Sequence, residues 1–144
     1  MNLFLMAIPI YLETTTQPSQ LLQQWRSTFL RGHTKGPALS IATGTLYAVA
    51  AWYRHVAGNA YWRVFAVAGA TTVSMIPYTW IVMMSTNNAL FSAVDASKEG
   101  QGAINWAEAE TLVVRWSRLN AVRALFPFSG AVIGMLGISG ILAF

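Results

Sequence analysis

The sequence lacks cysteine altogether and has only two histidines, His33 and His55, among its 144 residues. Without cysteine the chain has no disulfide, no thiolate nucleophile and no cysteine ligand for a metal. A hydrophobic run separates the two histidines, so a metal site built from imidazole groups is not expected. We therefore predict no metal ligands, while a single ion held by one histidine and carboxylates stays open.

Charge is also scarce. Charged residues make up 10% of the chain against 55% hydrophobic residues, and the mean hydropathy is +0.46. A soluble domain carries about a quarter charged residues, so the deficit indicates lipid as the main solvent. The net charge of +4 is too sparse and too interleaved with apolar residues for a nucleic-acid surface. No repeat, linker or low-complexity tract divides the chain, which predicts one integral membrane domain over residues 1–144.

Four apolar segments follow one another along the chain. Residues 1–12 would form a helix of only about 18 Å, short of a hydrocarbon core of roughly 30 Å, so we expect a short or truncated first span. The other three segments cover residues 37–53, 64–84 and 124–144. Between the first two spans, residues 20–30 have an amphipathic pattern with an apolar face of Leu21, Leu22, Trp25 and Phe29. The sequence thus predicts an all-α fold: a four-helix transmembrane bundle with an amphipathic helix between the first and second spans.

Proline, glycine and polar residues mark interruptions of these spans. Pro77 lies inside the third span and is expected to kink it. Residues 85–88 are expected to end that span, and residues 95–105 are the most polar stretch before the last helix. In the fourth span Gly130 and Gly134 form a GxxxG pattern, which is typical of close helix pairing and leaves a homo-oligomer open.

The basic residues predict the orientation in the membrane. Seven of the nine Lys and Arg residues lie in or beside the segments after the first and third spans: Arg26, Arg31, Lys35, Lys98, Arg115, Arg118 and Arg123. An excess of positive charge is typical of the cytoplasmic side. With four crossings, the segments after the first and third spans lie on the same side of the membrane. This places Glu13, His33 and Asn87 at this end, so we expect a multi-pass protein with its site at the cytoplasmic end.

Residues 112–123 have a polar face that a membrane anchor does not need. As a helix, this segment stacks Trp116, Asn120 and Arg123 at spacings of three and four residues. An arginine at depth in a bilayer costs several kcal/mol unless it faces a partner or a wet cavity. We therefore interpret this helix as the wall of a site.

Several motifs resemble those of the membrane anthrone oxygenase family. They extend over nearly the whole chain in the family's order: Pro9 with Glu13, Thr14-Thr15, Trp25, Gly32-His33, Pro37, Pro77-Tyr78-Thr79-Trp80, Met83 to Leu90, and Leu112 to Arg123 followed by Phe126-Pro127. The resemblance implies a small four-helix membrane protein that oxidises the central methylene of an anthrone to an anthraquinone with molecular oxygen. It also implies no established flavin or haem requirement. The chain differs from the family in its short amino end and in Glu13, where aspartate is more usual.

Oxygenation of an anthrone without an organic cofactor needs a base for the methylene proton, donors to the enolate oxygen and a flat apolar slot. As a hypothesis, His33 is the base, oriented by Glu13. The expected donors are Asn87, Asn120 and Arg123. Trp25 and Trp116 are expected to stack on the tricycle, and Thr86 and Asn88 complete the substrate-binding set.

Simpler interpretations stay open. His33 would then serve only as a donor at a helix end, Glu13 as a helix cap, and Trp25 as an anchor at the membrane interface. Two other functions also remain: a non-catalytic membrane scaffold or subunit for a partner enzyme, and a carrier of small lipophiles. The enzyme hypothesis implies a small aromatic substrate, molecular oxygen as co-substrate, a lipid membrane around the protein and no nucleic-acid partner.

Overall fold

The computed structural model describes residues 7–99 and 104–142, and every regular element in these ranges is helical. The predicted all-α class is therefore confirmed. The chain forms two compact units, each described here by itself. Within the described ranges the first unit comprises residues 7–33, 78–99 and 104–123, and the second unit comprises residues 34–77 and 124–142.

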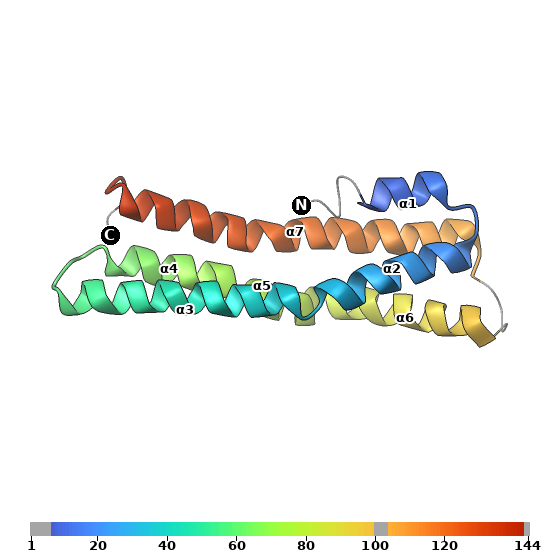
Figure 1. The fold of residues 1–144 in the computed structure, drawn as a ribbon, viewed down its shortest axis with the longest axis horizontal. Coiled ribbons are helices and arrows are strands. Elements are labelled where there is room, and N and C mark those ends of the chain that lie inside the picture. Colours follow the sequence, from blue (N-terminus) through green and yellow to red (C-terminus); the bar gives the residue numbers. More distant parts are fainter. Residues whose placement is uncertain (1–6, 100–103, 143–144) are drawn as a thin grey trace. The chain divides into compact units, whose positions relative to one another are not determined.

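The first unit is built from several helical segments: α1 (Ile8–Thr14), α2 (Pro18–Gly32), the π-helical turn η2 (Thr79–Met83), α6 (Met84–Glu99) and the first half of α7 (Trp106–Ile138) (Figure 1). Pro18 lies in the first turn of α2, where its missing N–H is not needed. The side chain of Asn105 caps α7 by accepting a hydrogen bond from the backbone N–H of Glu108 at 2.9 Å.

One continuous cluster of buried side chains forms the core of the first unit. Each helical segment of the unit contributes to it: Ile8, Leu21, Leu22, Trp25, Met83, Leu90, Val94, Ala109, Val113 and Trp116. On α2 the residues of this cluster are fully enclosed. The predicted amphipathic helix is thus confirmed, and its apolar face packs inside the unit.

The second unit contains α3 (Lys35–Val56), α4 (Trp62–Val73) and the second half of α7 (Figure 1). The turn between α3 and α4 includes Gly58 at a φ of 68°, a conformation that residues with a side chain rarely adopt. The hydroxyl of Tyr47 on α3 donates a hydrogen bond to the carbonyl of Gly130 on α7 at 3.3 Å. A Cβ on Gly134 would lie 2.5 Å from the same hydroxyl, so both glycines of the GxxxG pattern pack inside this unit.

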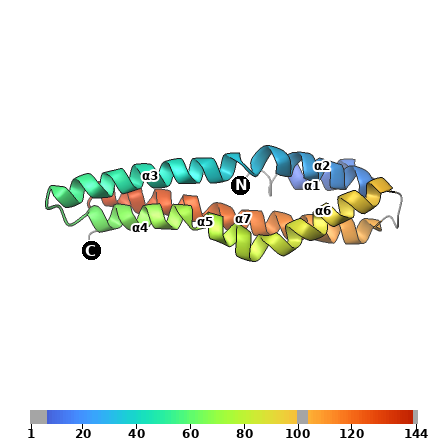
Figure 2. The same cartoon turned by 90° about the horizontal axis from the view of Figure 1, so that it is seen from below.

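The helix of the third predicted span is longer than expected. α4 is followed without a loop by α5 (Met75–Tyr78), η2 and α6 (Figure 2). The prediction that residues 85–88 end this helix is wrong, because α6 continues through them to Glu99. No Gly or Pro occurs between Tyr78 and Glu99, so nothing there breaks a helix. Pro77 lies inside α5, and the interruption expected there takes the form of the π-helical turn that follows.

Two described helical stretches are long and apolar enough to cross a membrane, by length and composition: Trp62–Lys98 with 37 residues and Trp106–Ile138 with 33 residues. The predicted first span is represented by α1, whose 7 residues reach about 10 Å. Residues 1–6 of that span lie outside the described residues. The four-span topology therefore stays a prediction.

Candidate active site

A small cavity in the first unit gathers several of the predicted site residues. Its volume is ≈ 20 Å³. Its wall comes from the end of α2, from the junction of η2 and α6, and from α7: Thr28, Phe29, Gly32, His33, Met83, Asn87, Trp116 and Arg123. Four residues predicted from the sequence therefore line one cavity, namely His33, Asn87, Trp116 and Arg123.

His33 lies directly after α2, where it is exposed and lines the cavity. Its Nδ1 is 3.0 Å from the carbonyl oxygen of Leu30. Because a carbonyl only accepts hydrogen bonds, Nδ1 carries the proton in this contact, and the Nε2 of a neutral ring keeps its lone pair. The ring is also stacked on Phe29, with 5.4 Å between centroids and 6° between planes. These contacts orient the ring and leave Nε2 able to accept a proton.

Glu13 does not take part in this arrangement. It is exposed in the last turn of α1 and, within the part of the chain that the structure describes, forms no hydrogen bond or ion pair with His33. The 15 residues of α2, about 22 Å of helix, lie between the end of the α1 segment and His33. Glu13 therefore does not orient His33 as expected. The carbonyl of Leu30 orients the ring instead, by accepting the hydrogen bond from Nδ1.

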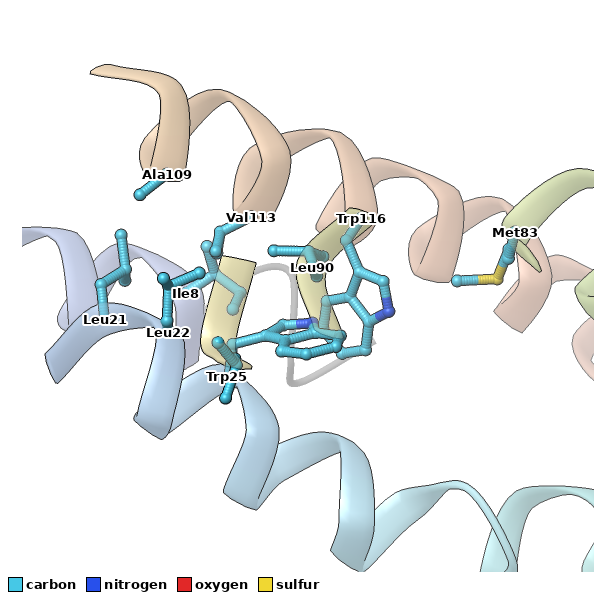
Figure 3. Packing of buried hydrophobic residues seen from close by; sticks show 10 residues of the cluster. Ile8, Leu21, Leu22, Trp25, Met83, Leu90, Ala109, Val113 and Trp116 are labelled. Atoms are coloured by element: carbon cyan, nitrogen blue, oxygen red, sulfur yellow. The ribbon is translucent and has the colours of Figure 1, made fainter. Parts of the chain in front are cut away.

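Trp25 is the centre of an aromatic cluster that shares Phe29 and Trp116 with the cavity wall. Figure 3 shows Trp25 beside Trp116. The centroid of its ring is 5.4 Å from Phe29, 5.1 Å from Phe91 and 5.8 Å from Trp116. The contact with Trp116 is edge to face, with 87° between the planes. Trp25 is 0% exposed, so in this conformation its ring is covered by protein and not open for the stacking on a substrate that we expected.

Buried polar atoms without a hydrogen-bond partner are concentrated in the first unit. Among the described residues they are Trp25 Nε1, Thr86 Oγ1, Asn87 Oδ1, Trp116 Nε1, Ser117 Oγ and Asn120 Nδ2. Native proteins leave few such groups unpaired, because each costs about 1–3 kcal/mol. Their accumulation on α2, α6 and α7 indicates a place where polar atoms of a ligand or water are bound.

The remaining predicted site residues, Thr86, Asn88 and Asn120, do not line the cavity, and they differ in how far they are buried. Thr86 and Asn120 are buried but do not line the cavity. Asn88 is exposed, so of the two neighbouring asparagines only Asn87 faces the interior. Ser117 is absent from the predicted set, although it is buried and its hydroxyl is unpartnered. Its signal in the sequence is the spacing of three residues to Asn120 on the same helix.

The polar groups of the cavity wall suit oxygen atoms. They include an imidazole, an amide, an indole and a guanidinium, and most of these donate hydrogen bonds. In the described ranges no three His, Asp or Glu side chains lie close enough together to hold a metal ion. The arrangement can therefore receive a proton at His33 and bind oxygen atoms at its other groups.

Comparisons with known proteins agree with the motifs of the sequence. A family model described as anthrone oxygenase matches residues 25–133. The chain is 56% identical over 144 residues to monooxygenase hypC of Dothistroma septosporum, covering all of this chain and 77% of the relative. It is 50% identical over 144 residues to a noranthrone monooxygenase of Aspergillus flavus, covering 68% of that relative.

A third relative is anthrone oxygenase AgnL2 of Paecilomyces divaricatus. It is 46% identical over 137 residues, which cover 94% of this chain and 84% of the relative. No solved structure matches the chain.

Proposed function

The chain belongs to the anthrone oxygenase family, and from this premise we propose that it oxidises the central methylene of an anthrone-type phenolic tricycle to the carbonyl of an anthraquinone. It is an anthrone oxygenase-like monooxygenase, in line with the names of its relatives. The observation that carries the site assignment is the cavity in which His33, Asn87 and Arg123 meet. The substrate is a small aromatic molecule, and molecular oxygen is the co-substrate.

The first proposed step removes a proton from the methylene carbon. An anthrone is acidic for a carbon acid, because its anion is delocalised and resembles a phenolate. Nε2 of His33 accepts this proton, since Nδ1 is held by the carbonyl of Leu30. His33 thus acts as the general base.

The second step places negative charge on the enolate oxygen. The amide of Asn87 and the guanidinium of Arg123, which line the cavity, donate hydrogen bonds to it, in a unit whose core is apolar. Asn120 is buried outside the cavity wall, so its role as a donor stays a prediction. The electron-rich carbon then reacts with oxygen directly, so we propose that no organic cofactor takes part. One oxygen atom becomes the new carbonyl oxygen, and the other leaves with the two methylene hydrogens as water.

The substrate needs more room than the cavity offers in this conformation. Pockets for such molecules measure roughly 300 Å³ or more, against ≈ 20 Å³ here. Phe29 and His33 lie at the end of α2 and are the wall residues that come from the exposed end of a helix. We propose that their side chains move apart to admit the tricycle, which then stacks against Trp116.

The second unit carries the membrane contact in this proposal. All five acidic residues of the chain lie in the segments of the first unit, and none lies in residues 34–77 or 124–144. Large hydrophobic side chains are exposed along α3 and the second half of α7: Leu39, Ile41, Leu46, Val49, Leu125, Phe128, Val132, Met135 and Ile138. α3 has 22 residues, about 33 Å, which matches a hydrocarbon core of roughly 30 Å. We propose that the second unit is embedded in lipid and that the first unit, which holds six of the nine Lys and Arg residues, faces the cytoplasm.

Oxygen uptake tests the function directly. Purified protein in detergent is given a hydroxylated anthrone, and oxygen consumption and anthraquinone formation are recorded together. The wild-type protein is expected to exceed uncatalysed autoxidation, and His33→Gln to lower kcat by about 100-fold or more, because it removes the base. The matched control is His55→Gln in the second unit, where His55 packs on Trp62 at 4.9 Å.

Two outcomes contradict the proposal in different ways. Wild-type uptake at the autoxidation rate would remove the oxygenase assignment and direct attention to the scaffold or carrier. Equal activity of His33→Gln and His55→Gln would keep the oxygenase but remove His33 as its base. The scaffold has less support, because the apolar face of α2 that would hold a partner is buried inside the first unit.

A further inference from the structure

The cavity beside Trp116 has the size of a single water molecule. A cavity needs about 10–15 Å³ to hold one water and two or more polar partners to bind it. Here the volume is ≈ 20 Å³, and both Asn87 Oδ1 and Trp116 Nε1 come from wall residues. The residues are 8% and 3% exposed, and neither atom has a hydrogen-bond partner among the described residues.

These two atoms have opposite hydrogen-bonding roles. The indole N–H of Trp116 only donates, and the amide oxygen of Asn87 only accepts. In Figure 3 the indole nitrogen of Trp116 lies on the edge of the ring that faces Met83, another residue of the cavity wall. A bound group must therefore accept at one side and donate at the other, as a hydroxyl group or a water molecule does.

The proposed reaction produces such a group. Addition of oxygen to the methylene carbon gives a carbon that carries one hydrogen and one hydroperoxide. A base then takes the remaining carbon-bound proton, the electron pair of that bond forms the new C=O bond, and the O–O bond breaks. The distal oxygen leaves with the O–O electron pair as hydroxide and takes up one proton to become water. This step requires a donor at the distal oxygen, because charge develops there as the bond breaks.

We propose that the cavity is the site of this leaving oxygen, with Trp116 Nε1 donating a hydrogen bond to the departing hydroxide and Asn87 Oδ1 accepting one from it. The assignment rests on the proposed function. It makes Trp116 a catalytic residue through its N–H group, in addition to any contact of its ring with the tricycle.

The test compares oxygen consumption with quinone formation in a single turnover. In the wild-type protein the two are expected to coincide. In Trp116→Phe, quinone formation is expected to lag oxygen consumption by about 100-fold, whatever the rate of oxygen consumption itself, and a hydroperoxide accumulates that iodide can titrate. Trp106→Phe, at the start of the same helix and outside the cavity wall, is the matched control and keeps the two signals together.

A second variant removes only the donor. Benzothienylalanine at position 116 keeps the shape of the bicyclic ring and replaces its N–H by sulfur, so the same lag is expected even if Trp116→Phe does not fold. Quinone formation in step with oxygen consumption in this variant would overturn the assignment, as would loss of both signals in a folded protein. A wild-type protein without oxygen uptake is a separate outcome, since it would overturn the proposed function itself.

Discussion

Trp25 is the largest fully buried side chain of the first unit. It has no exposed surface and contacts three other aromatic rings. Replacement by Ala is expected to lower the free energy of unfolding by about 3–5 kcal/mol, because it leaves a large cavity among these rings. Thermal unfolding in detergent, followed by circular dichroism, measures the change. Trp80→Ala is the control, since Trp80 is 67% exposed; equal shifts of the two variants would contradict this role.

Site residues that share one helix face could be predicted from their spacing in the sequence. Contacts between residues on different helices could not be predicted. Trp116 and Arg123 share a helix face at fixed spacing, and the structure places both in one cavity wall. Counting membrane crossings predicts Glu13 at the same end only if the first span crosses the membrane fully. The described α1 has only 7 residues, and α2 lies between it and His33. The orientation of the Trp25 ring depends on neighbours from three helices, and no local pattern in the sequence contains it.

At the scale of elements, close packing in the second unit depends on Gly130. A Cβ at this position would collide with the hydroxyl of Thr72 and would lie 2.8 Å from the carbonyl oxygen of Ala68. The backbone carbonyl cannot turn away as a side chain can, so Gly130→Ala is expected to cost about 1–3 kcal/mol and to lower the Tm.

The matched control is Gly32→Ala on α2. A Cβ there meets nothing within 4 Å, and the φ of Gly32 is not positive. Its Tm is expected to stay the same or to rise slightly, because Ala favours a helix by up to about 1 kcal/mol over Gly. A larger loss of stability in Gly32→Ala than in Gly130→Ala would contradict this account of the packing.

Most helices could be predicted from the hydrophobic pattern of the sequence. Some of their ends could not be predicted in this way. Pro18 and the apolar face of residues 20–30 indicated α2 correctly. Residues 85–88 look like a helix end because four polar side chains follow one another. Two of them, Thr86 and Asn87, are instead buried within α6, where polar side chains line an interior. The candidate site thus departs from the rule that buried helix faces are apolar.

For the whole molecule, the absence of cysteine makes the membrane proposal directly testable. Single cysteines at Leu46 and Met135, which are 70% and 66% exposed in the second unit, are expected to resist a membrane-impermeant maleimide in vesicles and to react after solubilisation. A cysteine at Arg118, exposed in the first unit, is expected to react in vesicles that present the cytoplasmic face. Equal labelling rates at the three positions in intact vesicles would contradict the proposal.

The division into two compact units could not be predicted from the sequence. The two long helical stretches Trp62–Lys98 and Trp106–Ile138 both continue from one unit into the other, so no linker or change of periodicity marks the boundary. The positions of the acidic residues do follow this division, because all of them lie in segments of the first unit. Hydropathy indicates the apolar spans but not the division into two units.

The π-helical turn after Pro77 holds about one residue more than an α-helical turn. The extra residue is absorbed in one widened turn, so loss of one residue from Thr79–Met83 would restore an α-helical turn and leave Asn87, Leu90 and Val94 on the interior face. In α6 each residue rotates the following side chains by about 100°. Loss of one residue between Met84 and Asn87 would therefore leave a continuous helix, yet would turn Asn87 away from the cavity. The segment from Pro77 to Asn87 thus tolerates a change of length at one place and not at the other.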